Sequence, residues 1–299
     1  MAGEKAGSLD KTGLALVLGT MTFWGLAPVY FHQLSDVPPL EFLAHRAIWT
    51  AITLCLIVGL QGRFAEVTTL MRSRQAPKVA LAALLVVINW GTFIWALQSG
   101  HALDASLGYY ICPLMVVLLA VFFRGERLGT AQWLAIALAA SGVIVLTAGL
   151  GVPPVVALGV SSSFAAYSLL KSGMKAPGEV TVACESLFLM PVAVAYLAYV
   201  HLGSAAGGYF GTSLWTTFLL AISGLITGLP LITFSMGSQR LPLAITGMAQ
   251  YINPTLQALL AITLFGEGLT IWHAPAFLLI WTGLAIFTTA VIRKDRAAG

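Results

Sequence analysis

Long uninterrupted runs of apolar residues alternate with short polar segments along the whole chain. A helix needs roughly 20 apolar residues to cross about 30 Å of hydrocarbon, and ten runs approach or exceed that length. The predicted spans cover residues 12–33, 38–60, 77–99, 102–123, 130–148, 153–173, 179–201, 213–237, 242–265 and 269–292. Most connections are very short, so we expect successive helices to be antiparallel neighbours. The pattern predicts an all-α polytopic membrane protein.

The composition supports this prediction. Hydrophobic residues make up 59% of the 299 residues and charged residues only 9%, whereas a soluble domain carries about 25% charged residues. Lipid as the surrounding solvent removes the need for a polar surface. Cys55, Cys112 and Cys184 lie inside apolar runs without metal or disulfide spacing. We therefore expect no metal and no cofactor. The modest net charge of +4 is explained by basic cytoplasmic loops, so we expect no nucleic-acid partner.

The basic residues predict the orientation. Of the 15 Lys and Arg residues, all except Arg46 fall in the two tails or in alternate connections. Positively charged loops stay on the cytoplasmic side, so both termini are expected in the cytoplasm of a bacterium, with the protein in its inner membrane. Lys171, at the end of the sixth span, is expected to extend its amine toward the cytoplasmic surface.

An internal repeat relates the two halves of the chain. GYYICPLMVVLLAVFFRGERL (108–128) matches AQYINPTLQALLAITLFGEGL (249–269) at an offset of 141, and Gly142 matches Gly283 at the same offset. Each half holds an odd number of spans, so the second half enters the membrane in the opposite direction. Inverted repeats around a midplane site are typical of alternating-access transporters.

The repeat also predicts the domain organisation. We expect a cytoplasmic tail at 1–11, a first five-helix repeat at 12–148, a second inverted repeat at 153–292 and a cytoplasmic tail at 293–299. The two repeats would surround a central cavity.

Several segments resemble the RarD group of the EamA family, within the drug/metabolite transporter superfamily. They are FWGLAPVYF (23–31), EFLAHRAIW (41–49), NWGTFIWA (89–96), ASLGYYICPL (105–114) and GMAQYINPTL (247–256). The resemblance implies a permease whose cavity is lined mainly by the first, third, fourth, sixth, eighth and ninth spans. Bacterial members of the group are named chloramphenicol-sensitive proteins, and related exporters handle amino acids and other small metabolites. Cys112 stands where the group is expected to have an Asn.

Polar and aromatic residues far from the span ends are the candidate substrate-binding residues. Aromatic belts lie at membrane interfaces, and amides in hydrocarbon need partners or a wet cavity. The alternative role for each is packing. The candidates are Trp24, Asn89, Trp90, Tyr110, Tyr167, Gln250, Tyr251 and Asn253.

Two matched prolines, Pro113 and Pro254, are candidate hinges or static kinks. Proline has no backbone N–H and clashes with the carbonyl four residues earlier. Pro254 should therefore release the carbonyl of Gln250 from its helical hydrogen bond.

Two groups of charged residues lie within spans. Arg46 and Glu185 are deeply placed, and they could form either a structural ion pair or a pair that couples transport to protons. Glu41 and His45 share one helix face. We interpret them as a local polar pair near the outer surface, with a proton relay as the alternative.

The sequence thus predicts a permease or exporter of amino acids or similar amphipathic solutes, with drugs as a further substrate class. Its partners would be a small-molecule substrate and membrane lipid, and it would be a monomer or a homodimer. The alternative is a polytopic membrane enzyme acting on a lipid or lipophilic substrate. That function would need a catalytic constellation, and the sequence has no HExxH, GxSxG or DDxxD motif.

Overall fold

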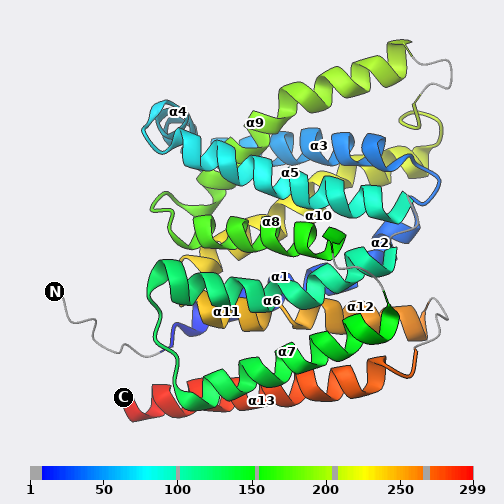
Figure 1. Cartoon of the computed structure of the whole chain (residues 1–299). Coiled ribbons are helices and arrows are strands. Elements are labelled where there is room, and N and C mark those ends of the chain that lie inside the picture. The colour runs from blue at the N-terminus through cyan, green and yellow to red at the C-terminus, as the bar shows by residue number, and fades with distance from the viewer. Residues whose placement is uncertain (1–8, 99–101, 152–154, 204–207, 265–269, 299) are drawn as a thin grey trace.

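A computed structural model of the chain describes residues 9–98, 102–151, 155–203, 208–264 and 270–298. All regular elements in these ranges are helices (Figure 1). They are α1 (Lys11–Leu26), α2 (Pro28–His32), α3 (Pro39–Leu60), α4 (Phe64–Arg72), α5 (Ala76–Gln98), α6 (Ala102–Arg124), α7 (Thr130–Leu150), α8 (Val155–Ser172), α9 (Gly178–Ala198), the π-helical η1 (Tyr199–Gly203), α10 (Leu214–Ser238), α11 (Leu243–Ala249), α12 (Ile252–Thr263) and α13 (His273–Ala298).

Within the described residues, nine helical segments are long and apolar enough to cross a membrane, with α1 and α2 counted as one. They lie roughly parallel or antiparallel to one another, and α1 begins and α13 ends on the left of Figure 1. The prediction of an all-helical, multi-span membrane protein is confirmed. The predicted span at 242–265 differs, because it consists of the two shorter helices α11 and α12.

The break between α11 and α12 comes one turn before Pro254. Gln250 and Tyr251 leave the helical pattern, and the Asn253 N–H donates to the Gln250 carbonyl at 3.2 Å. The carbonyl that Pro254 cannot bond is thus taken by a tighter, 3₁₀-type contact, so the expectation of a free Gln250 carbonyl was wrong. Helix α6, by contrast, continues through Pro113.

Helix α4 was not predicted. It lies between two spans, and its Val67 and Leu70 are buried while most of its other side chains are exposed. Its nine residues are too few to span a membrane. Arg63 anchors it by donating to Glu66 at 2.6 Å and also to Glu179 of α9. The Arg63 guanidinium lowers the pKa of the Glu66 carboxyl.

Helices that the repeat matches with each other are also partners in space. Contacts join α3 with α9, α6 with α11, and α7 with α13. At the last of these pairs, a Cβ on Gly142 would lie 2.7 Å from the Ala276 carbonyl oxygen. A Cβ on Gly283 would lie 2.6 Å from the Ala135 carbonyl oxygen. These reciprocal contacts follow the offset of 141. The inverted orientation of the two repeats and the domain boundaries stay predictions.

The Gly125-Glu126 pair, which the repeat also marks, stabilises the start of α11. Gly125 has a φ of 64°, a conformation that L side chains rarely adopt. The turn allows the Glu126 carboxylate to accept the N–H groups of Leu243 at 2.6 Å and Ala244 at 3.1 Å. A carboxylate at this position satisfies otherwise unpaired N–H groups and complements the helix dipole. The matched pair at 266–267 lies outside the described residues.

Buried apolar side chains form two main clusters. One joins α6, α7, α11 and α13, and the other joins α1, α3, α5, α9 and α10, with α8 contributing to both. These packed layers hold in place the helices that border the cavity described next.

Candidate functional site

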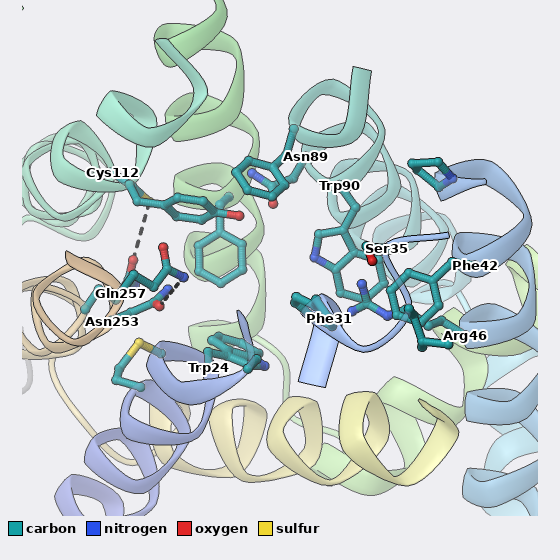
Figure 2. A pocket seen from close by; sticks show the side chains of 18 of the residues that line it. Trp24, Phe31, Ser35, Phe42, Arg46, Asn89, Trp90, Cys112, Asn253 and Gln257 are labelled. Atoms are coloured by element: carbon teal, nitrogen blue, oxygen red, sulfur yellow. Dashed lines mark hydrogen bonds between the residues drawn. The ribbon is translucent and has the colours of Figure 1, made fainter. Parts of the chain in front are cut away.

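A cavity of about 290 Å³ is bordered by α1, α2, α3, α5, α6, α8 and the broken segment α11–α12 (Figure 2). Most of its wall is aromatic or aliphatic. It is lined by Met21, Trp24, Ala27, Phe31, Leu34, Ser35, Val37, Pro39, Phe42, Arg46, Asn89, Trp90, Phe93, Tyr109, Cys112, Phe164, Gln250, Asn253 and Gln257. Apolar walls with a few polar groups are typical of small-molecule sites.

Arg46 lies at one side of the cavity, among aromatic rings. Its guanidinium carbon is 4.3 Å from the centroid of Trp90, 5.3 Å from that of Phe31 and 5.4 Å from that of Phe42. Its Nε donates to Thr227 Oγ1 at 3.0 Å. Among the cavity-lining residues that the structure describes, Arg46 is the only charged one. Its positive charge is therefore the dominant electrostatic feature of the cavity.

The amides of Asn253 and Gln257 lie at the side opposite Arg46 in Figure 2, and Asn89 lies between the two sides, next to Trp90. Gln257 Nε2 donates to Asn253 Oδ1 at 2.8 Å, and Cys112 Sγ contacts Gln250 Oε1 at 3.4 Å. Asn89 Nδ2 donates to the Val160 carbonyl at 2.7 Å, which fixes its orientation between α5 and α8. Amides both donate and accept, so this side can bond a polar group of either kind.

The structure brings five of the predicted binding residues to the cavity, namely Trp24, Asn89, Trp90, Gln250 and Asn253. The three predicted tyrosines do not line it. Tyr110 is buried and donates its hydroxyl to the Pro254 carbonyl at 3.2 Å. Tyr251 is fully buried within an apolar cluster. A role of any of these residues in binding stays a prediction.

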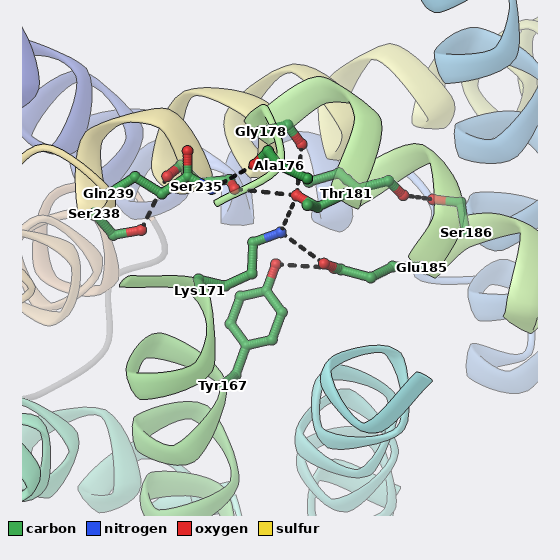
Figure 3. A network of polar contacts seen from close by, with 11 residues as sticks. Tyr167, Lys171, Ala176, Gly178, Thr181, Glu185, Ser186, Ser235, Ser238 and Gln239 are labelled. Carbon is green, nitrogen blue, oxygen red and sulfur yellow. Dashed lines mark hydrogen bonds and ion pairs between the residues drawn. The ribbon is translucent and has the colours of Figure 1, made fainter. Parts of the chain in front are cut away.

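Tyr167, the third of these tyrosines, belongs to a separate buried polar network (Figure 3). Its hydroxyl donates to Glu185 Oε2 at 3.1 Å. Lys171 Nζ lies 2.6 Å from Glu185 Oε1 and 2.7 Å from Thr181 Oγ1. The exposed fraction is 0% for Lys171 and 2% for Glu185. The network joins α8 to α9 beside the cavity, since the Tyr167 ring packs on Phe164 of the cavity wall.

Two sequence-based expectations are therefore wrong. Glu185 is paired with Lys171, not with Arg46, and among the described residues Arg46 has no ion-pair partner. Lys171 does not extend to the surface, because the buried carboxylate of Glu185 holds its amine inside the protein.

Glu41 and His45 are more buried than the sequence indicated, with exposed fractions of 1% and 5%. His45 Nε2 lies 3.9 Å from Glu41 Oε1, and that oxygen accepts the Tyr209 N–H at 2.6 Å. They are neighbours at the end of the bundle opposite the termini, and His45 Nε2 makes no hydrogen bond to Glu41.

Sequence reasoning missed Phe31, Phe42, Phe93, Tyr109 and Gln257 as cavity residues. A signal for Gln257 was present, because positions 250, 253 and 257 follow a helical spacing of three and four residues. The span of Arg46 was not expected to be a principal cavity helix. It contributes Pro39, Phe42 and Arg46, because the first turns of α3 border the aromatic side of the cavity.

Comparisons with known proteins identify the family. Residues 11–148 match the EamA-like transporter family. The chain is 38% identical over 290 residues to an uncharacterized transporter of Vibrio cholerae, covering 96% of this chain and 95% of that protein. It is 36% identical over 288 residues to Protein RarD of Escherichia coli, covering 96% and 97% of the two chains. It is 31% identical to the chloramphenicol-sensitive protein RarD of Pseudomonas aeruginosa, covering 97% and 99%.

A solved crystal structure shares the fold. It matches 93% of this chain and 98% of its own with a TM-score of 0.73, at 20% sequence identity. The family and several of the relatives are named as transporters, which agrees with the preference for a transporter over a membrane enzyme. The protein is a multi-pass membrane protein with a small-molecule substrate, and it belongs to the EamA-like transporter family, in a group that includes the proteins named RarD.

Proposed function

We propose that the protein is a permease of the bacterial inner membrane that moves small amphipathic solutes bearing a carboxylate, such as amino acids, by alternating access. The observation that carries this proposal is the position of Arg46, a single cation in the cavity without a carboxylate partner among the described residues.

The chemistry of Arg46 favours a carboxylate. A guanidinium presents five N–H donors in a planar fork that fits a carboxylate through two parallel hydrogen bonds. The Nε–H of Arg46 donates to Thr227, which leaves the two terminal nitrogens as the donors for a carboxylate. The rings of Trp90, Phe31 and Phe42 attract the cation, but they cannot neutralise its charge. A solute carboxylate would supply the missing negative charge.

The rest of the cavity suits the remainder of a small amphipathic solute. Aromatic walls between Arg46 and the amides offer apolar faces that can also hold an ammonium group. The amides of Gln250, Asn253 and Gln257 can bond a second polar group at the far side. A volume of about 290 Å³ is at the lower end of ligand pockets. These properties support a solute of amino-acid size with a charge at one end.

The break between α11 and α12 supports a mechanism in which the two halves rock about the cavity. Discontinuous helices at a midplane site are a recurring feature of transporters built from inverted repeats. Gln250 lies in this break and Asn253 in the first turn of α12, and both line the cavity, so a change in the bend would alter the binding surface. The positive-inside distribution of basic residues supports cytoplasmic termini.

A ligand screen by thermal shift on the purified protein tests this proposal. Each carboxylate solute is paired with its amide or methyl ester, which keeps the size and removes the negative charge. We expect at least one acid to raise the melting temperature of the protein, and its amide or ester to leave that temperature unchanged. Stabilisation by neutral partners to the same extent would overturn the assignment of a carboxylate substrate.

The effect should also depend on Arg46. A charge-assisted hydrogen bond contributes about 1.5–3 kcal/mol, so Arg46→Gln should weaken binding of the acid by about ten- to a hundredfold. Arg46→Lys keeps the positive charge but loses the planar fork of donors. We expect its affinity for the acid to lie between those of the wild type and Arg46→Gln.

A further inference from the structure

Three side chains that can ligate a metal converge at the end of the bundle opposite the termini, outside the cavity. Glu41 and His45 lie one turn apart on α3, and His201 comes from η1, about 160 residues later in the chain. Each offers one ligand atom, and the three atoms lie within 4.8 Å of one another. None of the three residues lines the cavity, so they have no part in the proposed transport site.

The burial of His45 points independently to a ligand. Its Nε2 is directed toward Glu41 Oε1 at 3.9 Å, which is too long for a hydrogen bond. That nitrogen is buried and has no hydrogen-bond partner among the described residues. The ring is held by stacking on Phe210, with centroids 5.0 Å apart. An unsatisfied buried polar group costs about 1–3 kcal/mol, and a metal ion bound to Nε2 would remove that cost.

Of the other two ligands, Glu41 is oriented by a backbone N–H, and His201 lies next to it. The Tyr209 N–H donates to Glu41 Oε1 at 2.6 Å, which orients the carboxylate as outer-shell partners do in metal sites. His201 Nε2 lies 4.0 Å from Glu41 Oε1. The His201 side chain is 32% exposed, so the cluster can be reached from solvent.

We propose that Glu41, His45 and His201 bind a divalent transition-metal ion, with Zn²⁺ as the best fit. Two imidazoles and one carboxylate are a ligand set that suits zinc, with a water in the fourth position. Bonds of about 2.1 Å at the tetrahedral angle separate two ligands by roughly 3.4 Å. The two histidine nitrogens lie 3.9 and 4.0 Å from Glu41 Oε1 and within 4.8 Å of each other, so metal binding needs the three side chains to move closer together. The bound ion would tie α3 to the segment after α9.

Zinc titration by calorimetry tests the site. The full-length protein is purified in detergent through a tag without histidine, with excess Mg²⁺ present because Mg²⁺ prefers oxygen ligands. We expect one Zn²⁺ per chain and a zinc-dependent rise in melting temperature. Loss of an outer-shell partner already costs roughly 10- to 100-fold in affinity, so His45→Ala, His201→Ala and Glu41→Gln should each weaken binding at least tenfold.

His32→Ala is the matched control, because it removes an exposed histidine at the same end of the bundle, and it should bind zinc as the wild type does. His201→Ala removes a partly exposed side chain, so its zinc-free melting temperature should stay near that of the wild type. Absence of zinc binding in the wild type, or unchanged affinity in both His45→Ala and His201→Ala, would overturn the proposal.

Discussion

Two buried or partly buried cations, Arg46 in the cavity lining and Lys171 in the polar network beside the cavity, have different partners. Lys171 is neutralised by Glu185 at 2.6 Å and bonded to Thr181. Arg46 contacts aromatic rings and one hydroxyl. Because Glu185 already neutralises the charge of Lys171, this amine is not available to bind a solute carboxylate. Arg46 has no such counter-ion among the described residues and can bind one.

Breaking the Lys171–Glu185 pair should destabilise the protein. Lys171→Met leaves the Glu185 carboxylate buried without its counter-ion, which costs about 3–5 kcal/mol. The expected result is a clear fall in melting temperature in detergent. The double variant Lys171→Met with Glu185→Met removes both charges and should recover much of the loss. A single variant as stable as the wild type would show that the pair is not needed for folding.

Glu185→Gln tests whether the same residue couples transport to protons. The amide cannot carry a proton on and off, but it can still accept the Tyr167 hydroxyl. We expect it to abolish any flux driven by a pH gradient in proteoliposomes while exchange of the solute without a gradient continues. Glu66→Gln, at an exposed carboxylate of α4, is the control. If gradient-driven flux survives in Glu185→Gln, the role of Glu185 is structural.

At the scale of elements, the packing of α7 against α13 can be tested by substitution. Gly142→Ala and Gly283→Ala each place a methyl group within 2.7 Å of a backbone carbonyl oxygen, and backbone cannot easily move aside. Overpacking of this kind costs about 1–3 kcal/mol. The two variants should lower the melting temperature to a similar extent, since their contacts are reciprocal.

Gly19→Ala is the control for these variants. A Cβ at Gly19 meets no atom within 4 Å, and alanine in a helix is favoured over glycine by roughly 0.5–1 kcal/mol. It should leave stability unchanged or slightly raised. Equal stability of Gly142→Ala and Gly19→Ala would contradict the close packing of α7 and α13.

The start of α11 provides a further prediction. Glu126→Ala removes the carboxylate that accepts the N–H groups of Leu243 and Ala244, and loss of such a cap costs about 0.5–2 kcal/mol. We expect faster hydrogen exchange at those two amides, measured by mass spectrometry of peptides covering 241–249. Unchanged exchange there would show that the carboxylate does not hold this helix end.

For the whole molecule, the sequence predicted the features that depend on local chemistry. Span positions follow from runs of apolar residues, and the repeat matches Gly142 with Gly283, the two glycines at which α7 and α13 approach closely. The break near Pro254 was also predictable, because proline lacks an N–H. The sequence could not predict that the break falls at Gln250 and Tyr251, since the 3₁₀-type contact of Asn253 depends on the neighbouring helices.

Tertiary contacts explain what the sequence could not predict. Lys171 lies in the last turn of α8, and only the fold shows that Glu185 of the next helix meets it. Arg46 becomes a cavity residue because α2 and α5 bring Phe31 and Trp90 around it. Tyr167 and Tyr251, chosen as mid-span aromatics, instead fill the core.

Solute flux into proteoliposomes, compared between the wild type and Arg46→Gln, tests the proposed function most directly. The solute is a labelled carboxylate that stabilises the purified protein. The proposal predicts saturable uptake by the wild type, competition by other carboxylates but not by their amides, and a loss of roughly tenfold or more in Arg46→Gln at low solute concentration. Equal flux through the wild type and Arg46→Gln, or uptake that neutral analogues compete for equally well, would contradict it.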